Sequence, residues 1–288
     1  MKYMREGLAD DYGIVKLQDK ILEIMVDVDA VCRKNDIKYC IMGGTALGAA
    51  RHGGFIPWDD DLDIFMEPAQ FEKFRACFAQ LPAGKYTLCG NIDAHGHTGL
   101  TKVRMNGTTY IEPLCRHRTD MHQGIYIDIF ILHNLPDNHI ARRWQYLWCR
   151  YLVLLGLAHC GYNRRGGIYR LILGLMRCLP VNFLRQYAME QAYCWDDGRL
   201  TKQKCHFMGK ARYQGGRFDA GWFATLKEVP FETVNLFAPA GLHEYLCARF
   251  GDYMKHPSPA QIKWEQHAEI WDTERDYSFY VNGEHDQR

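Results

Sequence analysis

The stretch that decides the fold is Gly43-Gly44-Thr45-Ala46-Leu47-Gly48-Ala49-Ala50-Arg51-His52-Gly53-Gly54-Phe55-Ile56-Pro57-Trp58-Asp59-Asp60-Asp61-Leu62-Asp63-Ile64. It begins with a glycine pair and ends with four aspartates within five positions. The stretch that contains Asp61 and Asp63 and continues through residues 62–66 is predicted to form a strand, and side chains two apart in a strand point to the same face. Asp61 and Asp63 therefore present two carboxylates together, which makes a site for a hard divalent cation.

The glycine pair stands between a predicted short strand at residues 38–42 and a predicted helix at residues 45–51. Backbone N–H groups and the dipole at the start of a helix attract phosphate, so Gly43, Gly44 and Thr45 are candidate phosphate ligands. A phosphate-binding turn beside a divalent-cation site indicates phosphoryl or nucleotidyl transfer.

Four further residues of this stretch are weaker candidates. Arg51 is a candidate ligand of phosphate, and His52 is a candidate for orienting the loop that follows. Asp59 and Trp58 are candidates for a role in the same site. The acidic run also admits a simpler interpretation as an exposed loop or a Ca²⁺-binding loop, although the spacing of an EF-hand is absent.

A third carboxylate interrupts the segment with the strongest strand pattern, residues 124–130. A charge in such a strand is costly unless it is paired or bound to metal, so Asp128 is predicted to complete the site. Lys102 and Arg104 project from one face of a predicted strand, where cations suit a polyphosphate donor. The alternatives are that Asp128 pairs with an arginine and that the two cations face solvent.

The order of predicted elements indicates a mixed sheet with helices. The first half of the chain predicts helices at 14–35, 45–51 and 67–80, and strands at 38–42, 62–66, 86–89, 100–105, 108–111 and 124–130. The second half predicts helices at 140–160, 168–178, 182–195 and 239–250, with strand-like pieces between 205 and 235.

We therefore predict the α+β class: a small α/β-like domain with a mixed β-sheet, plus a helical region. The three predicted parts are a catalytic core at 1–139, a helical lobe at 140–205 and an α+β segment at 206–288. The last part is expected to pack on the core and shape the substrate site.

The composition limits the class of protein and its location. The chain has 288 residues and a net charge of +1, so no overall electric field favours a nucleic-acid partner. Its eleven cysteines form no C-x-x-C pair, which predicts reduced, mostly buried thiols and a cytoplasmic protein. The most apolar stretch, 146–160, is shorter than the roughly 20 residues of a transmembrane helix.

Arginines gather along the predicted helical lobe among tryptophan and leucine. They are Arg142, Arg143, Arg150, Arg164, Arg165, Arg170 and Arg177. Two interpretations stay open. The lobe makes peripheral contact with the inner face of an anionic membrane, or it presents a solvated basic face or a groove for an acceptor phosphate.

Residues 43–64 resemble the signature of the LicD family, whose members include phosphocholine transferases and are related more distantly to the fukutin-type transferases. The resemblance continues through Lys102-Val103-Arg104 and residues 124–130, and more loosely through Phe250-Gly251-Asp252-Tyr253-Met254. It spans about residues 14 to 260 and is weakest over 140–205. The family often continues Phe-Pro-Leu-Asp after the acidic strand, whereas this chain has Phe130-Ile131-Leu132-His133.

The resemblance implies a nucleotidyltransferase fold, a divalent metal and a CDP- or CMP-activated donor. Asp61, Asp63 and Asp128 match the catalytic residues and ligands of Mg²⁺ or Mn²⁺, with two ions expected. Gly43, Gly44 and Thr45 match the donor-phosphate loop.

The implied reaction, of the EC 2.7.8 type, moves phosphocholine from CDP-choline to a hydroxyl of a cell-surface glycan, lipid-linked or free, and releases CMP. Alternatives are transfer of phosphoethanolamine, aminoethylphosphonate or a polyol phosphate, a nucleotidyltransferase that releases pyrophosphate, and a glycan- or metal-binding protein without catalysis. The altered residues 131–133 bear on the acceptor or headgroup pocket.

Overall fold

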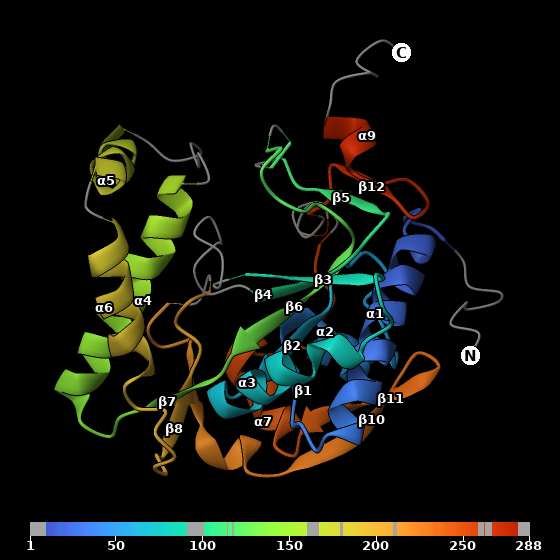
Figure 1. The fold of residues 1–288 in the computed structure, drawn as a ribbon. Coiled ribbons are helices and arrows are strands. Elements are labelled where there is room, and N and C mark those ends of the chain that lie inside the picture. The colour runs from blue at the N-terminus through green and yellow to red at the C-terminus, as the bar shows by residue number, and fades with distance from the viewer. Residues whose placement is uncertain are drawn as a thin grey trace.

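The chain folds around a five-stranded mixed sheet with the strand order β1-β2-β6-β4-β3 (Figure 1). The computed structural model describes residues 10–90, 101–113, 115–116, 118–159, 167–178, 181–209, 212–258, 262 and 267–281. The strands of the sheet are β1 (Cys40–Ile41), β2 (Asp63–Met66), β3 (Tyr86–Cys89), β4 (Thr101–Met105) and β6 (Tyr126–Ile131). Only β2 and β6 are parallel neighbours in this sheet. The mixed sheet with its helices confirms the predicted α+β class.

Smaller sheets and helices surround the central sheet. The helices are α1 (Val15–Lys34), α2 (Gly43–His52), α3 (Pro68–Cys77), α4 (His139–His159), α5 (Gly167–Cys178), α6 (Val181–Tyr193), α7 (Leu242–Phe250) and α9 (Ser278–Val281). β5 (Thr109–Ile111) pairs with β12 (Ile270–Asp272), and β10 (Leu226–Phe231) forms a hairpin with β11 (Val234–Pro239). β7 (His133–Leu135), β8 (Gln203–Cys205) and β9 (Arg217–Asp219) form a third small sheet.

One face of the central sheet is apolar and is covered by α1. Apolar side chains recur along α1 at helical spacing and are fully buried, among them Leu17, Ile21 and Met25. The helix packs across β6 and β4. The hydroxyl of Tyr86 on β3 donates a hydrogen bond to Asp27 of α1 at 2.6 Å, which fixes the helix against this face.

The opposite face of the sheet is divided into an apolar half and a polar half. The apolar half centres on Phe65 of β2, whose ring packs edge-on against Phe223 and Tyr245. These partners come from the segment that follows β9, so the C-terminal part of the chain covers this half. The polar half lies at the start of β2 and β6.

Several element boundaries differ from the sequence-based expectations. The second helix includes the glycine pair and starts at Gly43, and β2 starts at Asp63, so Asp61 precedes the strand. The short strands β7 and β12 were not predicted, because each pairs with a segment far away in the sequence. Leu100 and Cys160, at the edges of two predicted elements, lie outside the described residues.

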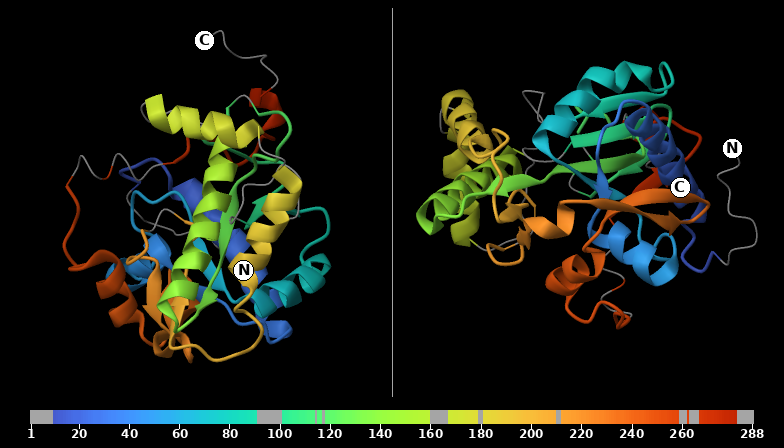
Figure 2. Two further views of the ribbon diagram at one scale, coloured as in Figure 1. Left: turned by 90° about the vertical axis from the view of Figure 1, so that its left-hand side faces the viewer. Right: turned by 90° about the horizontal axis from the view of Figure 1, so that it is seen from below.

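Helices α4, α5 and α6 form a separate layer beside the sheet, and Figure 2 shows this lobe on one side of the molecule. Helix α4 packs against both of the others. The lobe has its own buried clusters. One includes Leu152, Ala188 and Phe207, and the other consists of Leu155, Ala158, Leu173 and Met176. The three-part division of the chain stays a prediction.

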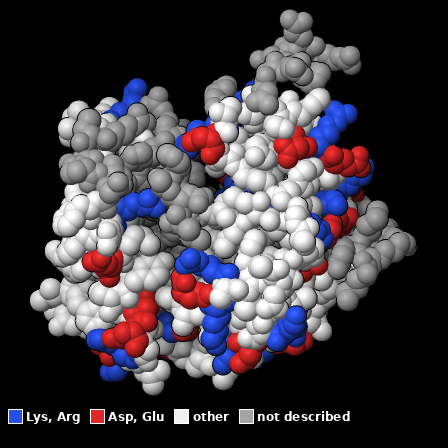
Figure 3. Space-filling model, viewed as in Figure 1, with Lys and Arg blue, Asp and Glu red and all other residues white. Residues whose placement is uncertain are grey.

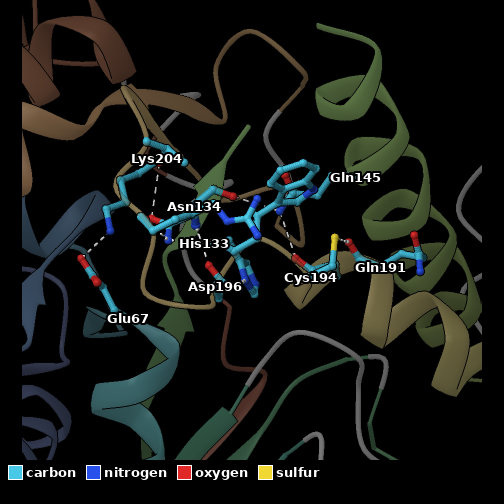
Figure 4. A network of polar contacts seen from close by, with 12 residues as sticks. Glu67, His133, Asn134, Gln145, Gln191, Cys194, Asp196 and Lys204 are labelled. Atoms are coloured by element: carbon cyan, nitrogen blue, oxygen red, sulfur yellow. Dashed lines mark hydrogen bonds and ion pairs between the residues drawn. The ribbon is translucent and has the colours of Figure 1, made fainter. Parts of the chain in front are cut away.

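A buried polar network joins the small sheet of β7, β8 and β9 to the lobe (Figure 4). A ring nitrogen of His133 on β7 lies 2.7 Å from Asp196 Oδ2, and the N–H of Asn134 donates to Asp196 Oδ1 at 2.7 Å. The side-chain amide of Gln145 on α4 donates to the carbonyls of Asn134 and Ala192 at 3.1 and 3.0 Å. His133, where the chain departs from the family pattern, therefore contacts the segment that follows α6.

The first prediction concerns this network. Asp196→Ala leaves the buried ring of His133 and the N–H of Asn134 without their acceptor, so we expect the free energy of unfolding to fall by about 2–4 kcal/mol. Asp197→Ala is the matched control, because Asp197 is exposed and, within the described part of the chain, its carboxylate pairs only with Arg199. Urea unfolding measures both variants, and equal midpoints would contradict the structural role of Asp196.

Candidate active site

Three charged side chains stand in a row across three neighbouring strands. Asp63, the first residue of β2, is the register partner of Asp128 on the parallel strand β6. Asp128 is in turn directly opposite Lys102 on the antiparallel strand β4. Directly opposed residues project to the same face of a sheet with their Cβ atoms about 4.5–5.5 Å apart. The sheet thus brings together two aspartates and one lysine that are far apart in the sequence.

Lys102 and Asp128 form a buried ion pair. The ammonium of Lys102 lies 3.0 and 3.1 Å from the two carboxylate oxygens of Asp128. It also stands 3.3 Å from the centre of the Tyr126 ring and 3.8 Å from the carboxylate of Glu112. Burial raises the pKa of Asp128, and Lys102 opposes that shift.

Asp61 directly precedes Leu62 and β2, and its carboxyl has a raised pKa. Burial raises the pKa of Asp61 to about 6, although the ring of His267, 3.6 Å away, acts in the opposite direction. Neighbouring Asp60 and Asp128 add to the increase. A carboxyl in this environment gains from a nearby cation, because the cation offsets both the burial and the repulsion.

Asp60 has a structural role that the sequence did not indicate. Its carboxylate accepts hydrogen bonds from the backbone N–H groups of His267 and Ala268 at 2.7 and 2.8 Å. Although burial raises the pKa of Asp60, these bonds and the His267 ring lower it overall. Asp60 therefore holds the C-terminal segment against the acidic loop, next to the pairing of β12 with β5.

The glycine pair allows two carboxylates to approach the start of α2. A Cβ atom at Gly43 would lie 3.2 Å from Asp63 Oδ2, and one at Gly44 would lie 2.5 Å from Asp59 Oδ2. The Gly43 N–H donates to the hydroxyl of Tyr245 at 3.0 Å. Both carboxylates therefore face the positive end of the helix dipole, which stabilises negative charge.

Thr45 connects the helix to the strand. Its hydroxyl oxygen accepts a hydrogen bond from the N–H of Asp63 at 2.8 Å, and the N–H of Met42 donates to the Asp63 carbonyl at 3.1 Å. Both backbone polar groups of Asp63, its N–H and its carbonyl, are therefore held by hydrogen bonds. The predicted binding of donor phosphate by Gly43, Gly44 and Thr45 stays a prediction.

Arg51 and His52 lie at the C-terminal end of α2, where Arg51 is about 12 Å from Gly43 by helix rise. The guanidinium of Arg51 donates to the carbonyl of Tyr253 at 3.1 Å and to a ring nitrogen of His52 at 2.9 Å. Trp58 is buried and packs edge-on against His52. Burial, with the charge of Arg51, lowers the pKa of His52. The ring of Trp58 therefore lies beside His52, although Trp58 directly precedes Asp59 in the chain. The predicted roles of these three residues stay untested.

Arg104 lies next to Lys102 on the same face of β4, deeper in the molecule. Its guanidinium donates to the carbonyl of Gly124 at 2.8 Å and stands 4.7 Å from the centre of the Tyr126 ring. Together with Lys102 it lowers the pKa of Glu112, against the effect of burial. Neither Arg104 nor Lys102 faces open solvent.

Sequence reasoning missed three residues that shape this site. Glu112 accepts a hydrogen bond from the Tyr126 hydroxyl at 3.1 Å, and its place at the end of a predicted strand was a weak signal. Tyr245 and His267 reach the site from more than 180 positions away in the sequence. Their sequence neighbourhoods carry no pattern that indicates this contact.

The residues present suit a cation that takes only part of its ligands from protein. Among the described residues, no three His, Cys, Asp or Glu side chains are grouped to hold a metal ion by themselves. Mg²⁺ is commonly held by one or two carboxylates, with substrate phosphate and water as its other ligands. Asp63 and Asp128 oppose each other in register, and each has a buried carboxylate oxygen. Together with nearby Asp61, these carboxylates fit that mode of binding.

Known proteins share this part of the chain. Residues 36–149, which contain Asp61, Asp63, Lys102 and Asp128, match the LicD/FKTN/FKRP nucleotidyltransferase domain. The chain is 25% identical over 247 residues to the lipopolysaccharide cholinephosphotransferase LicD of Haemophilus influenzae, an alignment that covers 82% of this chain and 89% of that protein.

A second known protein matches a shorter part of the chain. An uncharacterized protein of Rickettsia typhi is 44% identical over 64 residues, which is 21% of each chain. The expected resemblance is confirmed over residues 36–149. The chain therefore carries a nucleotidyltransferase domain of the LicD/FKTN/FKRP family.

Proposed function

We propose that this protein transfers phosphocholine from CDP-choline to a hydroxyl of a cell-surface glycan and releases CMP. The observation that carries the proposal is the row of Asp63, Asp128 and Lys102 in register within the family domain. The similarity to the Haemophilus influenzae protein, which is named a lipopolysaccharide cholinephosphotransferase, supports the choice of substituent and acceptor.

In this proposal Asp61, Asp63 and Asp128 hold Mg²⁺ or Mn²⁺, with two ions expected. When bound, the metal neutralises charge on the donor diphosphate and on the leaving nucleotide. Lys102, which otherwise pairs with Asp128, adds a positive charge beside the donor. The start of α2 orients the phosphates through backbone N–H groups and the helix dipole.

The chemical step is an in-line displacement at the phosphorus that carries choline. The acceptor oxygen forms the new P–O bond, the bond to the CMP oxygen breaks, and CMP leaves with that electron pair. Where Asp128 does not hold metal, it takes the proton of the acceptor hydroxyl, and burial raises its pKa. A raised pKa makes a carboxylate a better base near neutral pH.

The second prediction is the identity of the products. The protein is incubated with CDP-choline, Mg²⁺ and lipopolysaccharide, and nucleotides and labelled glycan are measured. We expect one phosphocholine incorporated for each CMP released, and none with EDTA. CDP-ethanolamine and polyol-linked CDP serve as parallel donors. Release of pyrophosphate from CTP would instead indicate a nucleotidyltransferase, and absence of nucleotide binding in calorimetry would indicate a non-catalytic protein.

The third prediction concerns the carboxylate row. Asp63→Asn and Asp128→Asn keep side-chain shape but remove negative charge, so we expect kcat to fall by at least about 100-fold. The matched control is Asp11→Asn, an exposed aspartate before α1, which should retain full activity. Thermal unfolding checks that each variant is folded. A folded variant of Asp63 or Asp128 with near-normal turnover would remove the basis of the proposal.

The fourth prediction concerns the start of α2. A methyl group at Gly44 would approach Asp59 Oδ2 to 2.5 Å, so the carboxylate must move. Because small misplacements at a catalytic site are costly, we expect Gly44→Ala to lower kcat/KM by about 10- to 100-fold. Gly174→Ala on α5 is the control, since a Cβ there meets no atom within 4 Å. Equal kcat/KM for both variants would show that the close approach at Gly44 is not required.

A further inference from the structure

The lobe differs sharply in charge from the rest of the chain. Residues 139–193 contain eight arginines and a single acidic residue, Glu190, while the whole chain has a net charge of only +1. Of these arginines, Arg164 and Arg165 lie outside the described residues. Arg170 on α5 is exposed. The lobe is therefore a strongly cationic part of a nearly neutral protein.

Large apolar side chains also gather on the surface of the lobe. Among the described residues, eight of thirteen exposed large hydrophobic side chains lie between residues 139 and 193. They are Ile140, Trp144, Leu147, Leu171, Ile172, Leu175, Phe183 and Tyr187. The part of the lobe that is coloured in Figure 3 is mainly white, with few charged side chains between uncharged ones. Such a concentration marks an interaction surface rather than scattered exposure.

Helix α5 shows most clearly that this surface lacks a cover within the described chain. Leu173 and Met176 on its inner side are buried against α4. On its outer side Leu171, Ile172 and Leu175 are 63%, 42% and 62% exposed. A helix that is apolar on both sides is expected to have both sides covered. The outer side of α5 therefore calls for a partner.

Aromatic side chains extend the apolar surface over α4 and α6. Trp144 and Trp148 on α4 pack edge-on with ring centres 5.6 Å apart, and Trp148 does the same with Tyr187 of α6 at 5.0 Å. Trp144 is 47% exposed, and its indole N–H donates to Gln191 at 2.9 Å. Tryptophan and tyrosine are the residues that favour the boundary between lipid and water.

We propose that the lobe binds an anionic lipid surface, with the outer side of α5 lying in the headgroup region. The combination of exposed leucine and isoleucine with net positive charge complements anionic lipid, since lipid provides both an apolar layer and negative charge. A second copy of the chain would bring the same positive charge to the contact. A nucleic acid would leave the apolar side chains uncovered.

The contact is peripheral. None of the helices in the described part of the chain is long and apolar enough to cross a membrane. A helix that lies along the interface needs only one buried apolar side, which α5 provides. This proposal does not rest on the proposed activity, because lipid binding is measured without turnover.

The test is co-sedimentation of the full chain with vesicles. We expect binding to vesicles of phosphatidylcholine with 30 mol% phosphatidylglycerol in about 0.1 M salt, and weaker binding in about 0.5 M salt, because salt screens the attraction. Leu171→Ser, Ile172→Ser and Leu175→Ser combined should lower the partition coefficient by at least about tenfold, since three apolar side chains no longer enter the interface.

The matched control replaces three exposed apolar residues outside the lobe, Leu200→Ser, Phe250→Ser and Met254→Ser, and should bind as the wild type does. A second lobe variant, Ile140→Ser with Leu147→Ser, changes exposed residues of α4 and should also bind more weakly. With it, a folding failure confined to the α5 variant does not decide the outcome. Absence of wild-type binding, or wild-type binding by both lobe variants, overturns the proposal. A wild-type dimer in vesicle-free solution that the α5 variant abolishes would assign the surface to a second copy instead.

Discussion

The parallel pairing of β2 with β6 is the constraint on which the site depends. It places Asp63 opposite Asp128, and the Asp128 N–H continues the ladder by donating to the Leu62 carbonyl at 2.9 Å. A shift of one residue would turn one of the two aspartates to the face covered by α1. The buried isoleucines that alternate with Asp128 oppose such a shift. The apolar pattern of the strand and the position of its charge therefore support the same register.

Bringing negatively charged carboxylates together on the inner strands β2 and β6 costs free energy, and the surrounding structure compensates for that cost. Lys102 pairs with Asp128, and two backbone N–H groups hold Asp60. The start of α2 faces Asp59 and Asp63, which only a glycine pair permits at such short range. The pKa of Asp61 is nevertheless raised to about 6 by burial and by the neighbouring carboxylates. Because these buried carboxylates repel one another, the cluster favours binding of a cation, either free or bound to the donor.

The lobe and the C-terminal segment show where reasoning from sequence stopped. The apolar periodicity of α4 and α5 predicted both helices, because the spacing of apolar residues that indicates a helix is a local feature of the sequence. The junction did not follow from the sequence: His133 finds Asp196 only because β7 pairs with β8, a strand about seventy residues away. The exposed outer side of α5 likewise could not be distinguished from its buried inner side by periodicity, since both sides are apolar.

The sequence by itself determined the α+β class, the acidic run and the strand that carries Asp128. Apolar side chains repeat about every two residues in strands and every 3.6 residues in helices, and both repeats are visible locally. Alternation also predicted that Lys102 and Arg104 share a face. Only the tertiary structure decided that Lys102 faces Asp128, that Asp61 precedes rather than belongs to β2, and that the ring of Trp58 packs against His52. It alone brought Tyr245 and His267 to the site. Contacts between distant segments depend on strand register and on packing of the whole chain, and no local pattern contains that information.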